Sequence, residues 1–169
     1  MLYYTVIKTK HNGTEHAGFR ISRPAGTDDY LFLHFKTPVI FDLCGKSRRI
    51  ESGECILLAP GTPPDFYPDG DVLVHDWMHF MPSDQQEYMK LKIDTNNFFT
   101  PVEPSIITSA VKRCEYELIS KDEFYQDVVS SEVTSMFIRL NRQMTNPAAG
   151  AHTDILKSLR LDIYRIPSN

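Results

Sequence analysis

The segment HDWMHF (75–80) contains the single tryptophan of the chain, with a histidine two residues to either side. An imidazole can bind a metal ion, transfer a proton or accept a hydrogen bond, and an indole offers a broad apolar face with one N–H donor. Alternate side chains of a β-strand share a face, so His75, Trp77 and His79 should point to one side and the other three residues to the opposite side. Because neither set is wholly polar, we expect both faces of this strand to be covered, one by a barrel interior and the other by a second layer.

A metal centre would need three or four His, Asp or Glu side chains that converge from neighbouring strands. The candidates are His34, His75 and His79, whereas His11 and His16 fall in an apparent loop. The sequence has no His-x-His pair ahead of a suitably spaced Glu, no local signature of a Ser-His-Asp or Cys-His site, and no Gly-rich phosphate loop. We therefore predict no metal, no cofactor and no catalytic residue.

Two further residues have more than one interpretation. Arg23 stands beside Pro24 at the end of a predicted strand, where its guanidinium could bind ligand hydroxyls or a carboxylate at the mouth of a barrel. A surface ion pair with Asp28 or Asp29 is the other interpretation. Trp77 is either a stacking surface for a sugar or planar ligand or the largest residue of a filled core.

The bulk composition is that of a folded globular protein. The chain has 169 residues, 41% hydrophobic and 24% charged, which suits one domain with a helical extension. A net charge of −4 argues against a surface that binds nucleic acid directly. The sequence shows no secretory signal and no run of about 20 apolar residues, so we expect a cytoplasmic protein without membrane contact. We interpret Cys44, Cys55 and Cys114 as buried apolar residues.

Up to about residue 100, short β-like runs alternate with turns rich in Gly, Pro and Asp, which indicates an antiparallel barrel or sandwich over 1–100. The expected strands are Tyr3–Lys8, Gly18–Ser22, Tyr30–Phe35, Val39–Cys44, Arg49–Glu51, Cys55–Leu58, Asp65–Tyr67 and Val72–Phe80.

Helical periodicity replaces this pattern over 101–169, where we expect a dimerisation and linker segment. The expected helices are Ile106–Leu118, Glu123–Met144 and Ala149–Ile166. The second has a long apolar stripe that favours a partner helix, and we predict a dimer interface there. Its residues are Val129, Val133, Met136, Phe137 and Leu140.

A series of short motifs resembles the N-terminal sensor and dimerisation domain of bacterial AraC-type transcriptional regulators. These motifs are, in order, Arg23-Pro24-Ala25-Gly26, Tyr30-Leu31, Gly53, Pro60-Gly61 and Trp77-Met78-His79-Phe80, followed by an apolar helical hairpin. The resemblance covers essentially the whole chain and implies a cupin-like β-barrel followed by helices that pair two subunits. It also implies that the DNA-binding helix-turn-helix module lies outside this sequence.

By motif position, the resemblance implies that Arg23, Phe66, His75 and Trp77 bind the effector. Phe66 replaces a tyrosine of the sugar-responsive founder of the family, and Pro64-Asp65 stands where the family commonly has histidine. We therefore expect a non-enzymatic domain that binds a small polar effector, sugar-like or otherwise, and forms a homodimer through its C-terminal helices. A metal-dependent cupin enzyme using the three histidines named above and a filled barrel that only dimerises are the alternatives.

Overall fold

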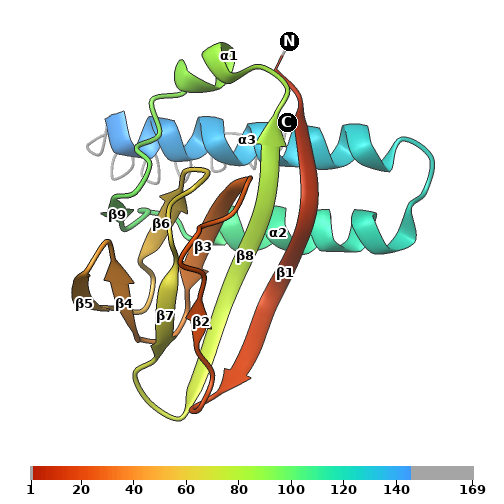
Figure 1. Cartoon of the computed structure of the whole chain (residues 1–169). Coiled ribbons are helices and arrows are strands. Elements are labelled where there is room, and N and C mark those ends of the chain that lie inside the picture. The colour runs from red at the N-terminus through yellow and green to blue at the C-terminus, as the bar shows by residue number, and fades with distance from the viewer. Residues whose placement is uncertain (1, 146–169) are drawn as a thin grey trace, which may run out of the picture.

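A computed structural model describes residues 2–145, which form two antiparallel sheets followed by helices (Figure 1). The strands are β1 (Tyr4–His16), β2 (Ile21–Ser22), β3 (Tyr30–Phe35), β4 (Val39–Leu43), β5 (Lys46–Ile50), β6 (Cys55–Leu58), β7 (Asp65–Pro68), β8 (Val72–Pro82) and β9 (Phe98–Phe99). The helices are α1 (Gln85–Met89), α2 (Ser105–Ser120) and α3 (Tyr125–Thr145). None of these helices has the length and hydropathy that crossing a bilayer would require.

The strand pairing defines the fold. The larger sheet has the order β1-β8-β3-β6-β9 and the smaller has the order β2-β7-β4-β5. The first strand thus pairs with the eighth, the second with the seventh, the third with the sixth and the fourth with the fifth. This is the pairing of an eight-stranded jelly roll, the architecture of cupin barrels. The predicted fold class, a cupin-like barrel followed by helices, is confirmed.

The two faces of β8 belong to two different cores. Trp77 packs with the apolar side chains between the sheets, whereas Met78 and Phe80 pack on the outer face of the larger sheet. The helices α2 and α3 cover that outer face (Figure 1). The expectation that both faces of this strand are covered is therefore confirmed.

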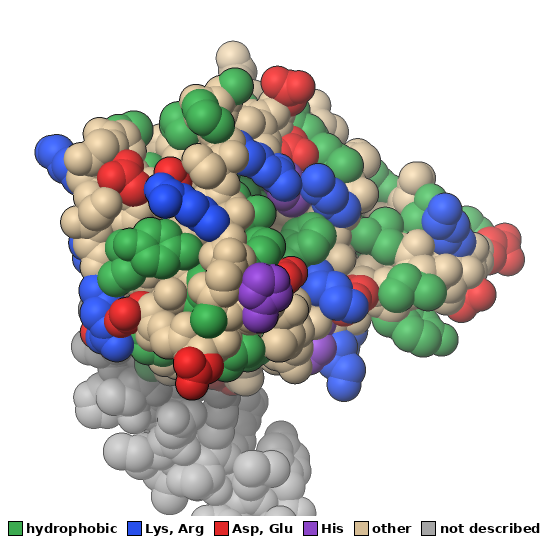
Figure 2. Space-filling model, turned by 60° about the horizontal axis from the view of Figure 1, so that its bottom comes forward, with side chains coloured by type: hydrophobic (Ala, Val, Ile, Leu, Met, Phe, Trp, Pro, Cys, Tyr) green, Lys and Arg blue, Asp and Glu red, His purple; other side chains and the backbone are tan. Residues whose placement is uncertain are grey.

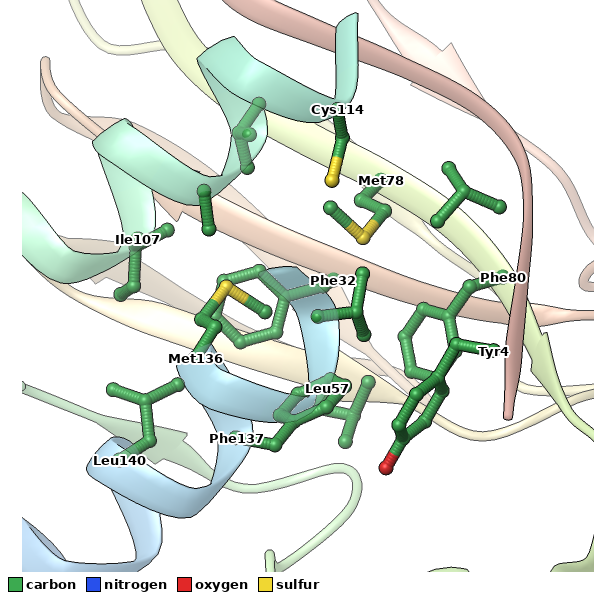
Figure 3. Packing of buried hydrophobic residues seen from close by; sticks show 14 of the residues in the cluster. Tyr4, Phe32, Leu57, Met78, Phe80, Ile107, Cys114, Met136, Phe137 and Leu140 are labelled. Carbon is green, nitrogen blue, oxygen red and sulfur yellow. The ribbon is translucent and has the colours of Figure 1, made fainter. Parts of the chain in front are cut away.

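The apolar stripe of α3 is buried within the chain. Met136, Phe137 and Leu140 point towards the larger sheet, where they meet residues such as Phe32 and Leu57 (Figure 3). All five residues predicted for the dimer interface are at most 1% exposed in the single chain. This corrects the prediction, because side chains already packed against their own sheet cannot pair with a second subunit while α3 stays in place. The five residues are Val129, Val133, Met136, Phe137 and Leu140.

Several boundaries differ from those predicted. β1 continues through His11 to His16, so these histidines lie in a strand and not in a loop. The short elements α1 and β9 were not predicted, and Cys44 is exposed although Cys55 and Cys114 are buried as expected. The predicted helix Ala149–Ile166 lies outside the described residues. The strands end at Phe99 and α2 begins at Ser105, on either side of the predicted boundary, but the division into two domains stays a prediction.

Candidate functional site

A cavity of about 210 Å³ lies inside the barrel, against the inner face of β8. It contains all four residues that the sequence suggested for effector binding: Arg23, Phe66, His75 and Trp77. Its other wall residues are Lys8, Glu15, Phe19, Ile21, Leu31, Leu33 and His79. The structure thus brings the four predicted residues together, and their binding of a ligand stays a prediction.

His75 is a buried polar residue of the cavity wall. It is 5% exposed, its ring stacks on Phe35, and the edge of the ring meets Phe66. Burial lowers the pKa of His75 to about 4, so the imidazole is neutral at neutral pH. Its Nδ1 atom has no hydrogen-bond partner in the part of the chain that the structure describes. A buried polar atom without a partner is rare and costly, so this nitrogen is a candidate contact for a ligand.

His79 lines the same cavity and is held by Asp29. The His79 Nδ1 atom lies 2.7 Å from the Asp29 carboxylate, and the edge of the His79 ring meets Trp77. Burial lowers the pKa of His79, although the neighbouring carboxylate opposes the shift. The sequence had suggested Asp29 as a possible ion-pair partner of Arg23. The structure assigns that carboxylate to His79 instead.

Arg23 is positioned by its loop and not by an ion pair. Within residues 2–145 no carboxylate lies in salt-bridge distance of its guanidinium, so neither suggested pair with Asp28 or Asp29 forms. Its backbone N–H donates to the Pro64 carbonyl at 3.0 Å, and its carbonyl accepts from Gly26 N–H at 2.9 Å.

Gly26 explains why the Arg-Pro-Ala-Gly and Pro-Gly motifs occur together. It has a φ of +71°, and a Cβ atom placed there would lie 2.4 Å from the Gly61 carbonyl carbon. In addition, the Gly61 N–H donates to the Thr27 carbonyl at 2.8 Å. The loop that carries Arg23 therefore packs directly on the Pro60-Gly61 turn, which only a glycine permits at this distance.

A second polar cluster lies behind the cavity, on the helix side of β8. Its centre is Asp76, which is fully buried and accepts hydrogen bonds from β1, β3 and α2. The donors are Asn12 N–H at 2.8 Å, Lys36 Nζ at 2.8 Å, Thr108 Oγ1 at 2.9 Å, His11 Nδ1 at 3.0 Å and His34 Nδ1 at 3.3 Å. Burial alone would raise the pKa of Asp76, but hydrogen bonds to His34, Asn12, Lys36 and Thr108 outweigh it and hold that pKa below its usual value.

The three histidines considered for a metal centre do not converge. His34 faces the helices and bonds to Asp76, whereas His75 and His79 face the cavity. In residues 2–145 no three His, Cys, Asp or Glu side chains are arranged to hold a metal ion. His34 is instead a buried histidine that is hydrogen-bonded in the core.

Sequence reasoning missed the wall that β1 contributes. Lys8 and Glu15 both line the cavity, but the first strand was expected to end at Lys8. Two irregularities in the pairing of β1 with β8, between Val6 and Lys8 and between Lys10 and Gly13, interrupt the alternation that would have revealed the longer strand.

The strand order and pairing place this chain in the class of cupin-like jelly-roll barrels, here with a helical layer. No protein-family model and no curated protein matches the sequence. Solved structures similar to it include the Cnp3 cupin domain of Schizosaccharomyces pombe, at 11% identity and a TM-score of 0.36 over 56% of this chain and 74% of that chain. A Cupin 2 conserved barrel domain protein of Salinispora arenicola is 14% identical, with a TM-score of 0.36 over 53% and 81%.

A third similar structure is an apo variant of ToxT from Vibrio cholerae. It is 10% identical and has a TM-score of 0.46, with 87% of this chain and 56% of the ToxT chain covered. At these scores the assignment to the cupin class rests on the strand order and pairing.

Proposed function

We propose that this chain is the effector-sensing and dimerisation domain of a cytoplasmic AraC-type transcriptional regulator. In this proposal a small polar, sugar-like molecule binds in the barrel, and DNA is contacted only by a separate module of the parent protein. The domain itself catalyses no reaction. The observation that supports the proposal is the cavity of about 210 Å³ that unites Arg23, His75 and Trp77, residues that the AraC-type resemblance had already singled out.

The wall chemistry suits a ligand that has both an apolar face and oxygen atoms. The indole of Trp77 offers a stacking surface for the C–H face of a ring. The neutral His75 imidazole can accept a hydrogen bond at Nδ1, and the Arg23 guanidinium can donate two parallel ones. Such a ligand switches a regulator only if it binds two conformations with different affinity, and about 1–3 kcal/mol of coupling is typical.

A thermal-shift screen of sugars, sugar acids and sugar phosphates tests the sensing proposal. A true ligand should raise the melting temperature and should also change the emission of Trp77 in a saturable way, because this is the only tryptophan. The variant Trp77→Leu should lose most of the thermal shift, whereas Tyr67→Leu, on an exposed position of β7, should keep it. A shift that is the same in Trp77→Leu would contradict binding in this cavity.

We propose that two copies of the chain meet at the far end of the helical layer, and not through the apolar stripe of α3. The connection between α2 and α3 protrudes beyond the sheet, and hydrophobic side chains gather on it (Figure 2). Ile119 in the last turn of α2 is 76% exposed, and Phe124 in the connection is 68% exposed. If two copies meet there, Ile119→Lys should yield monomers in sedimentation velocity, and Met89→Lys, at another exposed apolar position, should not. A dimer that persists in Ile119→Lys would count against this surface.

A further inference from the structure

The two ends of the barrel cavity differ in charge. Lys8 lies opposite His79 in the pairing of β1 with β8, and Glu15 lies opposite Leu73. Six residues of strand separate these positions on β8, a span of roughly 20 Å. The loop that begins at Arg23 leads to Asp29, whose carboxylate bonds to His79, and the charges of Lys8 and Arg23 both act to lower the pKa of His79. Both cations therefore lie at the His79 end. Glu15, the acidic residue of the wall, lies at the other end.

The cationic end holds the Asp29 carboxylate, which is hydrogen-bonded to His79 and paired with neither cation. Within the described chain neither Lys8 nor Arg23 has a carboxylate in salt-bridge distance. The hydrogen bond to His79 leaves the Asp29 carboxylate charged, so two cations and one carboxylate lie at this end. Two cations at the edge of an apolar cavity favour an anionic group between them, and a guanidinium binds a carboxylate with two parallel hydrogen bonds.

The middle of the cavity offers few polar groups. Between the His79 and His75 positions the wall is formed by Trp77 and by Leu33, which lies opposite it on β3. A molecule with hydroxyl groups on every side would leave several of them without a partner here, and each such loss weakens binding roughly tenfold or more. A flat apolar body, by contrast, fits against the indole and Leu33.

At the end of the cavity away from His79, His75 can accept a hydrogen bond from a ligand. His75 is 5% exposed and its Nδ1 atom has no partner among residues 2–145. Gly13 of β1 lies opposite His75 in the strand pairing. A neutral imidazole has one acceptor nitrogen, and Nδ1, which has no partner among the described residues, can accept a hydrogen bond.

From this arrangement we infer that the effector is a small, flat carboxylic acid with a hydroxyl or N–H group at the end opposite its carboxylate. The carboxylate lies between Arg23 and Lys8, the flat body lies on Trp77, and the donor bonds to Nδ1 of His75. The inference rests on the proposed sensing function and narrows its ligand from a sugar-like molecule to an acid.

Calorimetric titration with three related probes tests this ligand class. The probes are para-coumarate, its neutral amide, and cinnamate, which lacks the hydroxyl. The wild-type protein should bind para-coumarate about ten- to a hundredfold more tightly than the amide, because the amide loses the charged contact, and about tenfold more tightly than cinnamate. Added salt should reduce the preference for para-coumarate over its amide, because the charged contact lies at the partly exposed mouth of the cavity.

Variants assign the two preferences to residues. Arg23→Gln and Lys8→Gln should each remove most of the preference for acid over amide, and His75→Phe should remove the preference for para-coumarate over cinnamate. Arg113→Gln is the matched control, because Arg113 pairs with Glu132 on the helical layer outside the cavity. If His75→Phe does not fold, para-methoxycinnamate replaces it as a test, since its blocked hydroxyl should bind the wild-type protein no better than cinnamate.

The possible results separate this inference from the broader proposal. Equal affinity for acid and amide, or acid binding that survives both cation substitutions, would overturn the inference. If no acid probe gives saturable heat up to about 10 mM while neutral sugars do bind, the ligand class is wrong and the sensing function stands. Failure of the acid probes and of the sugar screen together would count against both.

Discussion

Replacement of Asp76 by Asn should test the polar cluster behind the cavity most directly. The Asp76 carboxylate is fully buried and accepts hydrogen bonds from two histidines, a lysine, a hydroxyl and a backbone N–H. An amide of the same shape would turn one of its acceptors into an N–H group that faces donors. Removal of one partner from a buried charge pair costs about 3–5 kcal/mol, and for a domain of this size each kcal/mol corresponds to about 2–4 °C.

We therefore expect the melting temperature of Asp76→Asn to fall by about 6–20 °C in thermal denaturation followed by circular dichroism. Asp69→Asn is the matched control, because Asp69 forms a partly exposed ion pair with Arg49, and such pairs contribute about 0–1 kcal/mol. Loss of its pair should change the melting temperature little.

The pH dependence gives a second, independent readout. The pKa of Asp76 in the folded protein lies below its ordinary value of 3.8, so its contribution to stability is complete above pH 3.8 and is lost as the pH falls towards the folded pKa. The gap between the wild-type protein and Asp76→Asn should therefore narrow below that pH. A melting temperature equal to that of Asp69→Asn, or a gap that stays constant at low pH, would refute the role assigned to this carboxylate.

Three further predictions concern other parts of the fold. Gly26→Ala should destabilise the protein by more than Gly45→Ala in urea denaturation, because both glycines have positive φ but only Gly26 would bring a Cβ to 2.4 Å from Gly61; equal losses would exclude the close contact as the cause. The pKa of His75 is lowered from 6.5 to about 4, so between these pH values the unfolded chain binds a proton that the folded chain does not, and the wild-type protein loses up to about 3 kcal/mol of stability as the pH falls. His75→Asn should not show this loss. A variant with the same pH profile as the wild-type protein would argue against a neutral buried imidazole. Phe137→Ala should cost about 3–5 kcal/mol in the same urea assay, because the ring is fully buried inside the chain; a loss below about 1 kcal/mol would contradict this packing.

The barrel strands could be predicted where the local pattern is simple. Tyr30–Phe35 and Cys55–Leu58 have the predicted bounds, because each is a short apolar run between clear turn residues. The two faces of β8 followed from alternation alone. β1 could not be predicted beyond Lys8, because the bulge near Asn12 shifts the register of the strand. That bulge places the Asn12 N–H on Asp76, a contact 64 residues distant in sequence.

The helices show a different limit. The bounds of α2 and α3 follow the predicted helices to within a few residues, because the apolar stripe recurs at helical spacing. A stripe of this kind indicates that one face of a helix is buried, but it does not say what buries it. Here the covering surface is the outer face of the chain's own sheet, so the stripe around Val133 and Phe137 carries no information about a second subunit.

The candidate site was predicted only in part, because a local sequence pattern does not show which surface a side chain will face in the folded protein. Resemblance to AraC-type domains pointed to Arg23, Phe66, His75 and Trp77, which the fold does gather around one cavity. Lys8 gave no comparable signal, because a lysine on an edge strand is ordinarily a solvated surface residue. Only the curvature of the barrel shows that its side chain reaches the cavity.

Alternate side chains of β8 connect the wall of the barrel cavity to the helical layer. Trp77 and its neighbour Asp76 are consecutive residues, one against the cavity and the other bonded to Thr108 in the first turns of α2. A ligand stacked on Trp77 would therefore lie one residue away from the carboxylate that holds the first turn of α2.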